Sequence, residues 1–98
     1  MRARRWAILL GPVWCVVGCS EPLSGEECNA LLDHYVSLLA ASDRPGTNDA
    51  ELVRLRAQAR EKAAKDPAFR RCAHEVTRGK FECAMRADSA DHLEQCLL

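Results

Sequence analysis

Apolar residues after position 25 recur at the three- and four-residue intervals that place side chains on one face of a helix. The first such stripe comprises Cys28, Leu31, Leu32, Tyr35, Leu38 and Leu39. Ser24 and Glu27 precede it with the spacing of a capping box, in which each side chain hydrogen-bonds the other residue's backbone at the start of a helix. The pattern therefore predicts a first helix over residues 26–41.

Turn and capping signals divide the rest of the chain into further helices. Residues 43–46 (DRPG) combine turn-forming residue types. A second helix is expected after Asn48, a third from the Asp-Pro pair at 66–67, a short one after a turn at 77–79, and a last one capped by Ser89. No stretch shows the period-two alternation of a strand. We therefore predict an all-α fold, a small bundle of helices and helix hairpins cross-linked by disulfides.

The first eighteen residues have the layout of a secretory signal peptide. Three arginines and no acidic residue occupy positions 1–5, and an apolar run without charge follows over 6–17. This run of 12 residues fits the apolar core of a signal peptide. A membrane-spanning helix would need about 20 apolar residues. We therefore predict that residues 1–18 are removed on export and are not retained as a transmembrane segment.

The end of this leader resembles the lipobox of bacterial lipoproteins in the sequence Val16-Val17-Gly18-Cys19. The resemblance implies that a diacylglyceryl group is transferred to the Cys19 sulfur, that the leader is cleaved before this residue, and that the new amine receives an N-acyl chain such as palmitate. Cys15 lacks the small preceding residue that the peptidase requires, because it follows a tryptophan. The alternative is an ordinary signal peptide that leaves Cys19 as a free thiol.

A lipoprotein resemblance implies three parts for this chain: a signal peptide (1–18), a lipidated N-terminus with a tether (19–25), and a helical domain (26–98). Ser20 stands where an aspartate would resemble an inner-membrane retention signal. This favours the periplasmic face of the outer membrane over the inner membrane. The lipid bilayer, reached through Cys19, is then the first expected partner, and the covalent lipid is the only expected prosthetic group.

Four further cysteines indicate a disulfide framework, since an even number of thiols in a short exported chain is typical of one. Each bridge adds about 2–4 kcal/mol to a small domain. The preferred pairing joins Cys72 to Cys83 across the predicted turn at 77–79 and leaves Cys28 with Cys96; the two other pairings stay open. The spacing C-x43-C-x10-C-x12-C is loosely similar to small cysteine-containing helical envelope lipoproteins, and this similarity carries no functional residue across.

Metal binding and catalysis are not expected from the motifs. The cysteines form no C-x-x-C knuckle of a zinc site, and only His92, four residues before Cys96, shares a helix face with a cysteine. Asp33, His34 and Ser37 are the residue types of a hydrolase triad, but adjacent helical positions diverge by about 100° and cannot converge on one atom. We therefore expect neither a metal nor a catalytic residue.

Charge is segregated along the exported part. Residues 19–53 hold seven acidic residues and one basic residue, residues 54–80 hold nine basic and three acidic, and residues 81–98 hold four acidic and one basic. The zero net charge of the whole chain argues against a nucleic-acid partner. The basic block offers candidate contacts to anionic lipid or to an envelope protein through Arg54, Arg56, Arg60, Arg70 and Arg71. The favoured alternative is intramolecular, with the basic segment packed between the acidic first and last segments.

These observations predict a membrane-anchored envelope lipoprotein that is a structural or protein-interaction module without catalysis. The alternative function is binding of a small ligand or inhibition of a periplasmic enzyme. A cavity of several hundred Å³ would favour ligand binding, whereas an exposed apolar patch would favour a protein partner.

Overall fold

The computed structural model describes residues 22–98, and this part of the chain consists of helices joined by short loops, without strands. The signal peptide and Cys19, on which the lipoprotein prediction depends, lie outside the described residues. The six helices are α2 (Gly25–Asp43), α3 (Asp49–Ala64), α4 (Pro67–Arg70), α5 (Cys72–Glu75), α6 (Arg78–Met85) and α7 (Ala90–Leu97). The all-α prediction is therefore confirmed.

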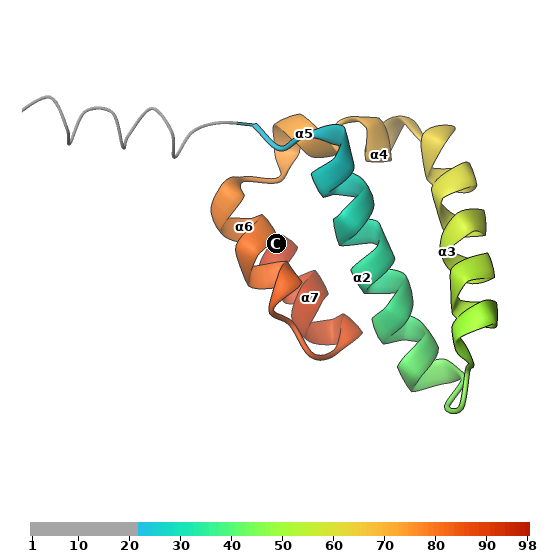
Figure 1. Ribbon diagram of the computed structural model, residues 1–98. Helices are drawn as coiled ribbons and strands as arrows, with labels where there is room; N and C mark the ends of the chain where they lie inside the picture. The colour runs from blue at the N-terminus through green and yellow to red at the C-terminus, as the bar shows by residue number, and fades with distance from the viewer. Residues whose placement is uncertain (1–21) are drawn as a thin grey trace, which may run out of the picture.

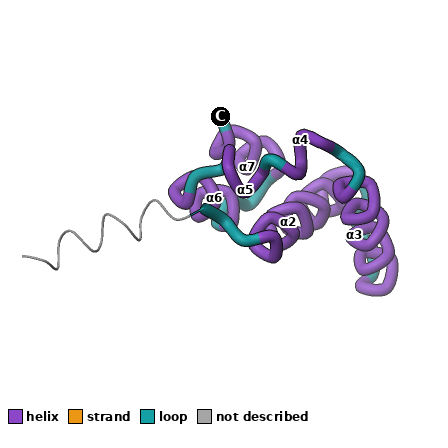
Figure 2. Tube along the Cα trace, turned by 90° about the horizontal axis from the view of Figure 1, so that it is seen from above, coloured by secondary structure: helices purple, strands orange, loops and turns teal. Residues whose placement is uncertain are grey.

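Helix α2 lies in the middle of the molecule. Helix α3 runs antiparallel along one side of it, and α6 with α7 forms a short antiparallel hairpin on the other side (Figure 1; Figure 2 gives the view from above). The short helices α4 and α5 connect these two sides across the end of the molecule at which α2 begins. No helix among the described residues combines the length and the apolar character that crossing a membrane requires.

Local capping explains where the longer helices begin. The predicted capping box of α2 is present: the Glu27 backbone N–H donates to Ser24 Oγ at 3.0 Å, and the Ser24 N–H donates to Glu27 Oε1 at 2.9 Å. Asn48 Oδ1 accepts the N–H of Glu51 at 2.8 Å at the start of α3. Ser89 caps α7 in the same way. Each cap satisfies a backbone donor that has no partner within its helix.

The segment after residue 66 differs from its prediction. Instead of one helix it forms two single-turn helices, α4 and α5, the first capped by Asp66. The predicted turn at 77–79 is wrong as well, because the chain leaves α5 at Val76 and α6 begins directly after Thr77. Thr77 Oγ1 accepts the N–H of Lys80 at 3.2 Å, so the threonine acts as a helix cap and Gly79 lies within the first turn of α6.

Two small clusters form the core. The first contains Leu31 of α2 and Leu93 of α7, the latter only 2% exposed, together with Ala84 and Ala87, whose small side chains let α6 approach both helices. The His34 ring adds a 2.9 Å hydrogen bond from α2 to the carbonyl oxygen of Ala87. This first cluster thus joins α2 to the C-terminal half of the domain.

The second cluster lies at the start of α2 and consists of Leu23, Cys28 and Cys72. Leu23 is 4% exposed, although the sequence placed it in a tether over 19–25. Leu23 therefore belongs to the packed part of the chain, because a buried leucine contributes about 1.5–3 kcal/mol that a free tether would forgo.

Candidate functional site

The disulfides are Cys28–Cys72, with Cα atoms 6.2 Å apart, and Cys83–Cys96, with Cα atoms 5.7 Å apart. The preferred pairing of Cys72 with Cys83 and of Cys28 with Cys96 is wrong, and one of the two alternatives holds. The reason is the early break at 76–77. Helix α5 is too short to form a hairpin with α6, so Cys72 faces α2, while the α6–α7 hairpin brings Cys83 opposite Cys96.

The two bridges lie in different surroundings. Cys28 and Cys72 are 4% and 7% exposed and belong to the core around Leu23. Cys83 and Cys96 are only partly buried and link α6 to α7, with Cys96 packed at the edge of the first core cluster. The first bridge fixes α5 against α2, and the second closes the hairpin, so together they hold the walls of the groove described next.

An open groove of about 490 Å³ runs between α2, the α4–α5 segment and α7. Its walls are mostly apolar and include Leu31, Leu32, Phe69, Val76, Leu93 and Leu97. The groove forms because α4 and α5 turn across the start of α2 while α7 packs farther along the same helix. This leaves a strip of the apolar face of α2 uncovered.

Tyr35, Glu75 and Glu94 supply the polar part of the groove wall. The Tyr35 hydroxyl donates a hydrogen bond to Glu94 Oε2. This bond raises the pKa of Tyr35, with smaller contributions from burial and from the negative charges of Glu94 and Asp91, because the carboxylate favours the protonated phenol. Glu75 accepts a hydrogen bond from Arg71 Nε at 2.9 Å. Carboxylates therefore flank an apolar floor.

The basic residues of α3 contact its neighbour α2. Arg60 makes a two-pronged ion pair with Asp33, at 3.0 Å from Nε to Oδ1 and 2.6 Å from Nη2 to Oδ2, and the pair raises the pKa of Arg60. Arg56 donates to the Ser37 hydroxyl through Nε at 3.2 Å. The Ser37 hydroxyl also donates to the Asp33 backbone carbonyl at 2.8 Å, whereas the Asp33 carboxylate pairs with Arg60 and the His34 ring contacts the Ala87 carbonyl.

The other three arginines named from the sequence also have partners inside the domain. Arg54 pairs with Glu51 at 3.4 Å, Arg71 with Glu75 at 2.9 Å, and Arg70 Nε donates to a backbone carbonyl at 3.3 Å. The intramolecular alternative is correct in that the basic segment meets an acidic one. Its geometry is wrong, since α3 lies on one side of α2 and not between the first and last segments (Figure 1).

Sequence reasoning missed the groove, although it named several of its side chains. Leu31, Leu32 and Tyr35 were assigned to an apolar stripe, and a stripe alone does not say which part of it stays uncovered. The available signal was the C-terminal helix, where Leu93 and Leu97 alternate with acidic residues such as Glu94. That pattern indicates an apolar face with an acidic border.

No protein-family model matches the chain, and no curated protein or solved structure matches it either. The geometry of the groove and the disulfides is therefore the basis for assigning a function.

Proposed function

We propose that this chain is a small envelope lipoprotein, anchored in the membrane through an acylated Cys19, that acts without catalysis as a protein-binding module. Its binding surface is the apolar groove between α2, α4–α5 and α7. The observation that carries the proposal is this groove of about 490 Å³, in which Leu32, Phe69 and Leu97 are partly exposed above the buried Leu31 and Leu93. The Cys28–Cys72 disulfide links two of its walls, α2 and α5.

The preferred occupant is an amphipathic, basic helix of a partner protein. Helices bind to such grooves by inserting apolar side chains at intervals of three and four residues. Glu75 and Glu94 flank the apolar wall, and the exposed Asp91 lies on the same helix as Glu94. Basic residues beside the apolar stripe of the partner would complement these carboxylates, which favours correct orientation and a fast encounter.

The position of the groove fits an anchor at Cys19. Leu23, the first buried residue of the part that the structure describes, belongs to a cluster against which Phe69 and Val76 pack, and these two residues also line the groove. Cys19 lies four positions before Leu23, and an extended chain spans at most about 14 Å over this separation. The groove would then face a partner at or near the bilayer surface, with the periplasmic face of the outer membrane favoured.

A small apolar ligand is the second candidate occupant. The groove volume falls within the range of about 300–1,000 Å³ that is usual for ligand pockets. Glu75 and Glu94 disfavour a fatty-acid carboxylate, so this ligand would be neutral or cationic. Titration of the full chain in detergent with a neutral and an anionic acyl probe of equal length distinguishes ligand binding from protein binding. Specific, saturable uptake of the neutral probe would support binding of a small ligand.

Site-specific photocrosslinking in intact envelopes tests the main proposal. A photoreactive residue at position 97 in the groove should give one discrete adduct with a protein, and Glu94→Lys should abolish it. The same residue at position 53 on α3, where Val53 is 63% exposed, is the matched control and should give no such adduct. Equal adducts at both positions, or an adduct insensitive to Glu94→Lys, would contradict the proposal.

Mass spectrometry of the purified mature protein tests the anchor. Lipidation predicts an N-terminal residue at position 19 that carries the mass of a diacylglyceryl group and an N-acyl chain. An unmodified Cys19, or a chain that keeps residues 1–18, would rule out the anchor without affecting the groove experiment.

A further inference from the structure

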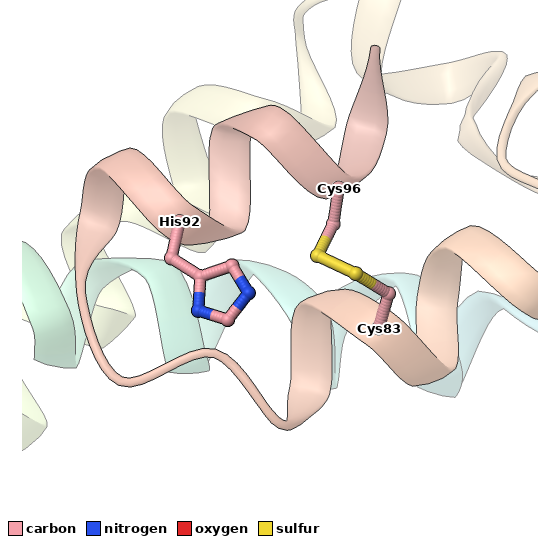
Figure 3. Close-up of side chains that lie close together, drawn as sticks. All are labelled: Cys83, His92 and Cys96. Carbon is pink, nitrogen blue, oxygen red and sulfur yellow. A yellow bond between two sulfur atoms is a disulfide. The ribbon is translucent and has the colours of Figure 1, made fainter.

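Cys83, His92 and Cys96 form a second feature that the binding groove does not use. Figure 3 shows His92 one turn before Cys96 on α7, with Cys83 on the facing helix α6. One ligand atom from each residue lies within 4.8 Å of the other two. In Figure 3 the ring nitrogen remote from the backbone points toward the two sulfurs.

We propose that the Cys83–Cys96 disulfide is the oxidised, closed form of a zinc site, which binds one Zn²⁺ through Cys83, His92 and Cys96 after reduction. Zinc prefers this set of two thiolates and one imidazole, with Zn–S distances of about 2.3 Å and Zn–N distances of about 2.0 Å. Those bond lengths place tetrahedral ligand atoms about 3.3–3.8 Å apart. The present spacing within 4.8 Å therefore needs only side-chain rotation.

The surroundings of the two disulfides make this bridge the one that a reductant reaches first. Thiol–disulfide exchange requires direct access of the attacking thiolate to a sulfur atom. Cys28 and Cys72 are buried in the core, whereas Cys83 and Cys96 are partly exposed beside His92, whose side chain is 50% exposed. The buried bridge continues to hold α5 against α2 while the outer bridge is open.

The chemistry needs a dithiol reductant and Zn²⁺. The dithiol attacks one sulfur of the Cys83–Cys96 bond, and its second thiol resolves the mixed disulfide. The dithiol is oxidised to a disulfide by two electrons, and Cys83 and Cys96 are released as two thiols. Zn²⁺ then displaces one proton from each thiol and binds both thiolates and the neutral imidazole of His92, with water in the fourth position.

Asp88 provides a contact that would orient the histidine. Its Oδ1 lies 3.6 Å from His92 Nδ1, which leaves Nε2 for the metal. This separation is longer than a hydrogen bond, and the Asp88 side chain is 93% exposed. A small rotation would let Nδ1–H donate to Oδ1, as the second ring N–H of metal-bound histidines usually does to an oxygen. Asp88 is thus a positioning residue and not a ligand.

The first test follows the order of reduction. The full chain with Cys15→Ser and Cys19→Ser, kept in detergent, is treated with increasing dithiothreitol, alkylated and mapped by peptide mass spectrometry. Alkylation of the outer pair at a reductant concentration that leaves Cys28–Cys72 intact is expected. The proposal would be overturned if both bridges opened together or if the buried one opened first. It would also be overturned by a loss of helical circular dichroism on selective reduction, since the site requires the folded hairpin.

The second test measures Zn²⁺ binding to the selectively reduced protein by competition with a chromophoric chelator. One equivalent is expected for the reduced form and none for the oxidised form. His92→Ala should weaken binding at least about tenfold, and Asp88→Asn should weaken it about tenfold. His74→Ala, at an exposed histidine of α5, is the matched control and should leave affinity unchanged. Zinc binding that is absent, or equal in the His92 and His74 variants, would refute the site.

Discussion

Removal of each disulfide in turn should destabilise the domain to different extents. The Cys28–Cys72 bridge joins residues 44 positions apart, and Cys83–Cys96 joins residues 13 apart. Loop-closure entropy then assigns about 4 kcal/mol to the first bridge and about 3 kcal/mol to the second. Truncation of two buried cysteines to alanine also leaves small cavities in the Leu23 cluster, which adds to the cost of the first change.

A domain of this size has a free energy of unfolding of about 4–12 kcal/mol. The variant Cys28→Ala/Cys72→Ala should therefore lose between about a third and all of this free energy, and Cys83→Ala/Cys96→Ala should lose less and still unfold cooperatively. Urea titration followed by far-ultraviolet circular dichroism measures both, with the intact-disulfide chain as the reference. Non-reducing peptide mapping of each variant confirms that the remaining bridge has formed.

The reasoning would fail if the hairpin variant lost more stability than the core variant, or if either loss were below about 1 kcal/mol. The first result would mean that the hairpin, and not the contact of α5 with α2, holds the domain together. The second would mean that the unfolded chain is already constrained by other contacts, so that loop-closure entropy does not measure the bridges.

Three further changes test the core and the charged contacts. Leu93→Ala should lower the free energy of unfolding, measured by urea titration, by about 2–5 kcal/mol. The control Val53→Ala, at an exposed site, should change it by less than about 0.5 kcal/mol. Equal losses in the two variants would contradict the assigned core. The hydrogen bond of Tyr35 contributes stability that is complete below a pH of about 10 and is lost as the pH rises through the raised pKa of the folded state. Tyr35→Phe removes this contribution, so the free energies of unfolding of wild type and variant should converge at alkaline pH. The ion pair of Glu27 with Arg78 lowers the pKa of Glu27, so its contribution to stability is present above the ordinary glutamate pKa and is lost as the pH falls. The free energy of unfolding of Glu27→Gln should therefore be lower than that of wild type at neutral pH and equal to it in acid. A difference that does not depend on pH would refute the pairing.

Local features of this chain could be predicted from its sequence because their causes lie within a few residues. Ser24, Asn48 and Ser89 cap helices through hydrogen bonds to backbone groups three residues later. The Asp-Pro pair at 66–67 interrupts the helix through the geometry of proline itself. The all-α class follows from these signals and from the three- and four-residue spacing of apolar positions.

Competing local signals were harder to decide. The sequence predicted a turn over residues 77–79, in which Thr77 and Gly79 both took part. In the folded chain the threonine caps α6, and the helix accommodates the glycine at a cost of only about 1 kcal/mol. The packing of α6 against α7, and not a hairpin across residues 76–77, brings Cys83 opposite Cys96.

Tertiary structure alone decided the disulfide pairing, the groove and the cysteine–histidine cluster. The sequence placed His92 and Cys96 on one helix face, but the position of Cys83 opposite them depends on how α6 packs against α7. The groove likewise exists because α4–α5 and α7 cover different parts of the apolar face of α2. Helix starts are set by contacts within one turn, whereas the disulfides join residues 44 and 13 positions apart and the groove joins residues of α2 and α7, whose meeting depends on the packing of the whole domain.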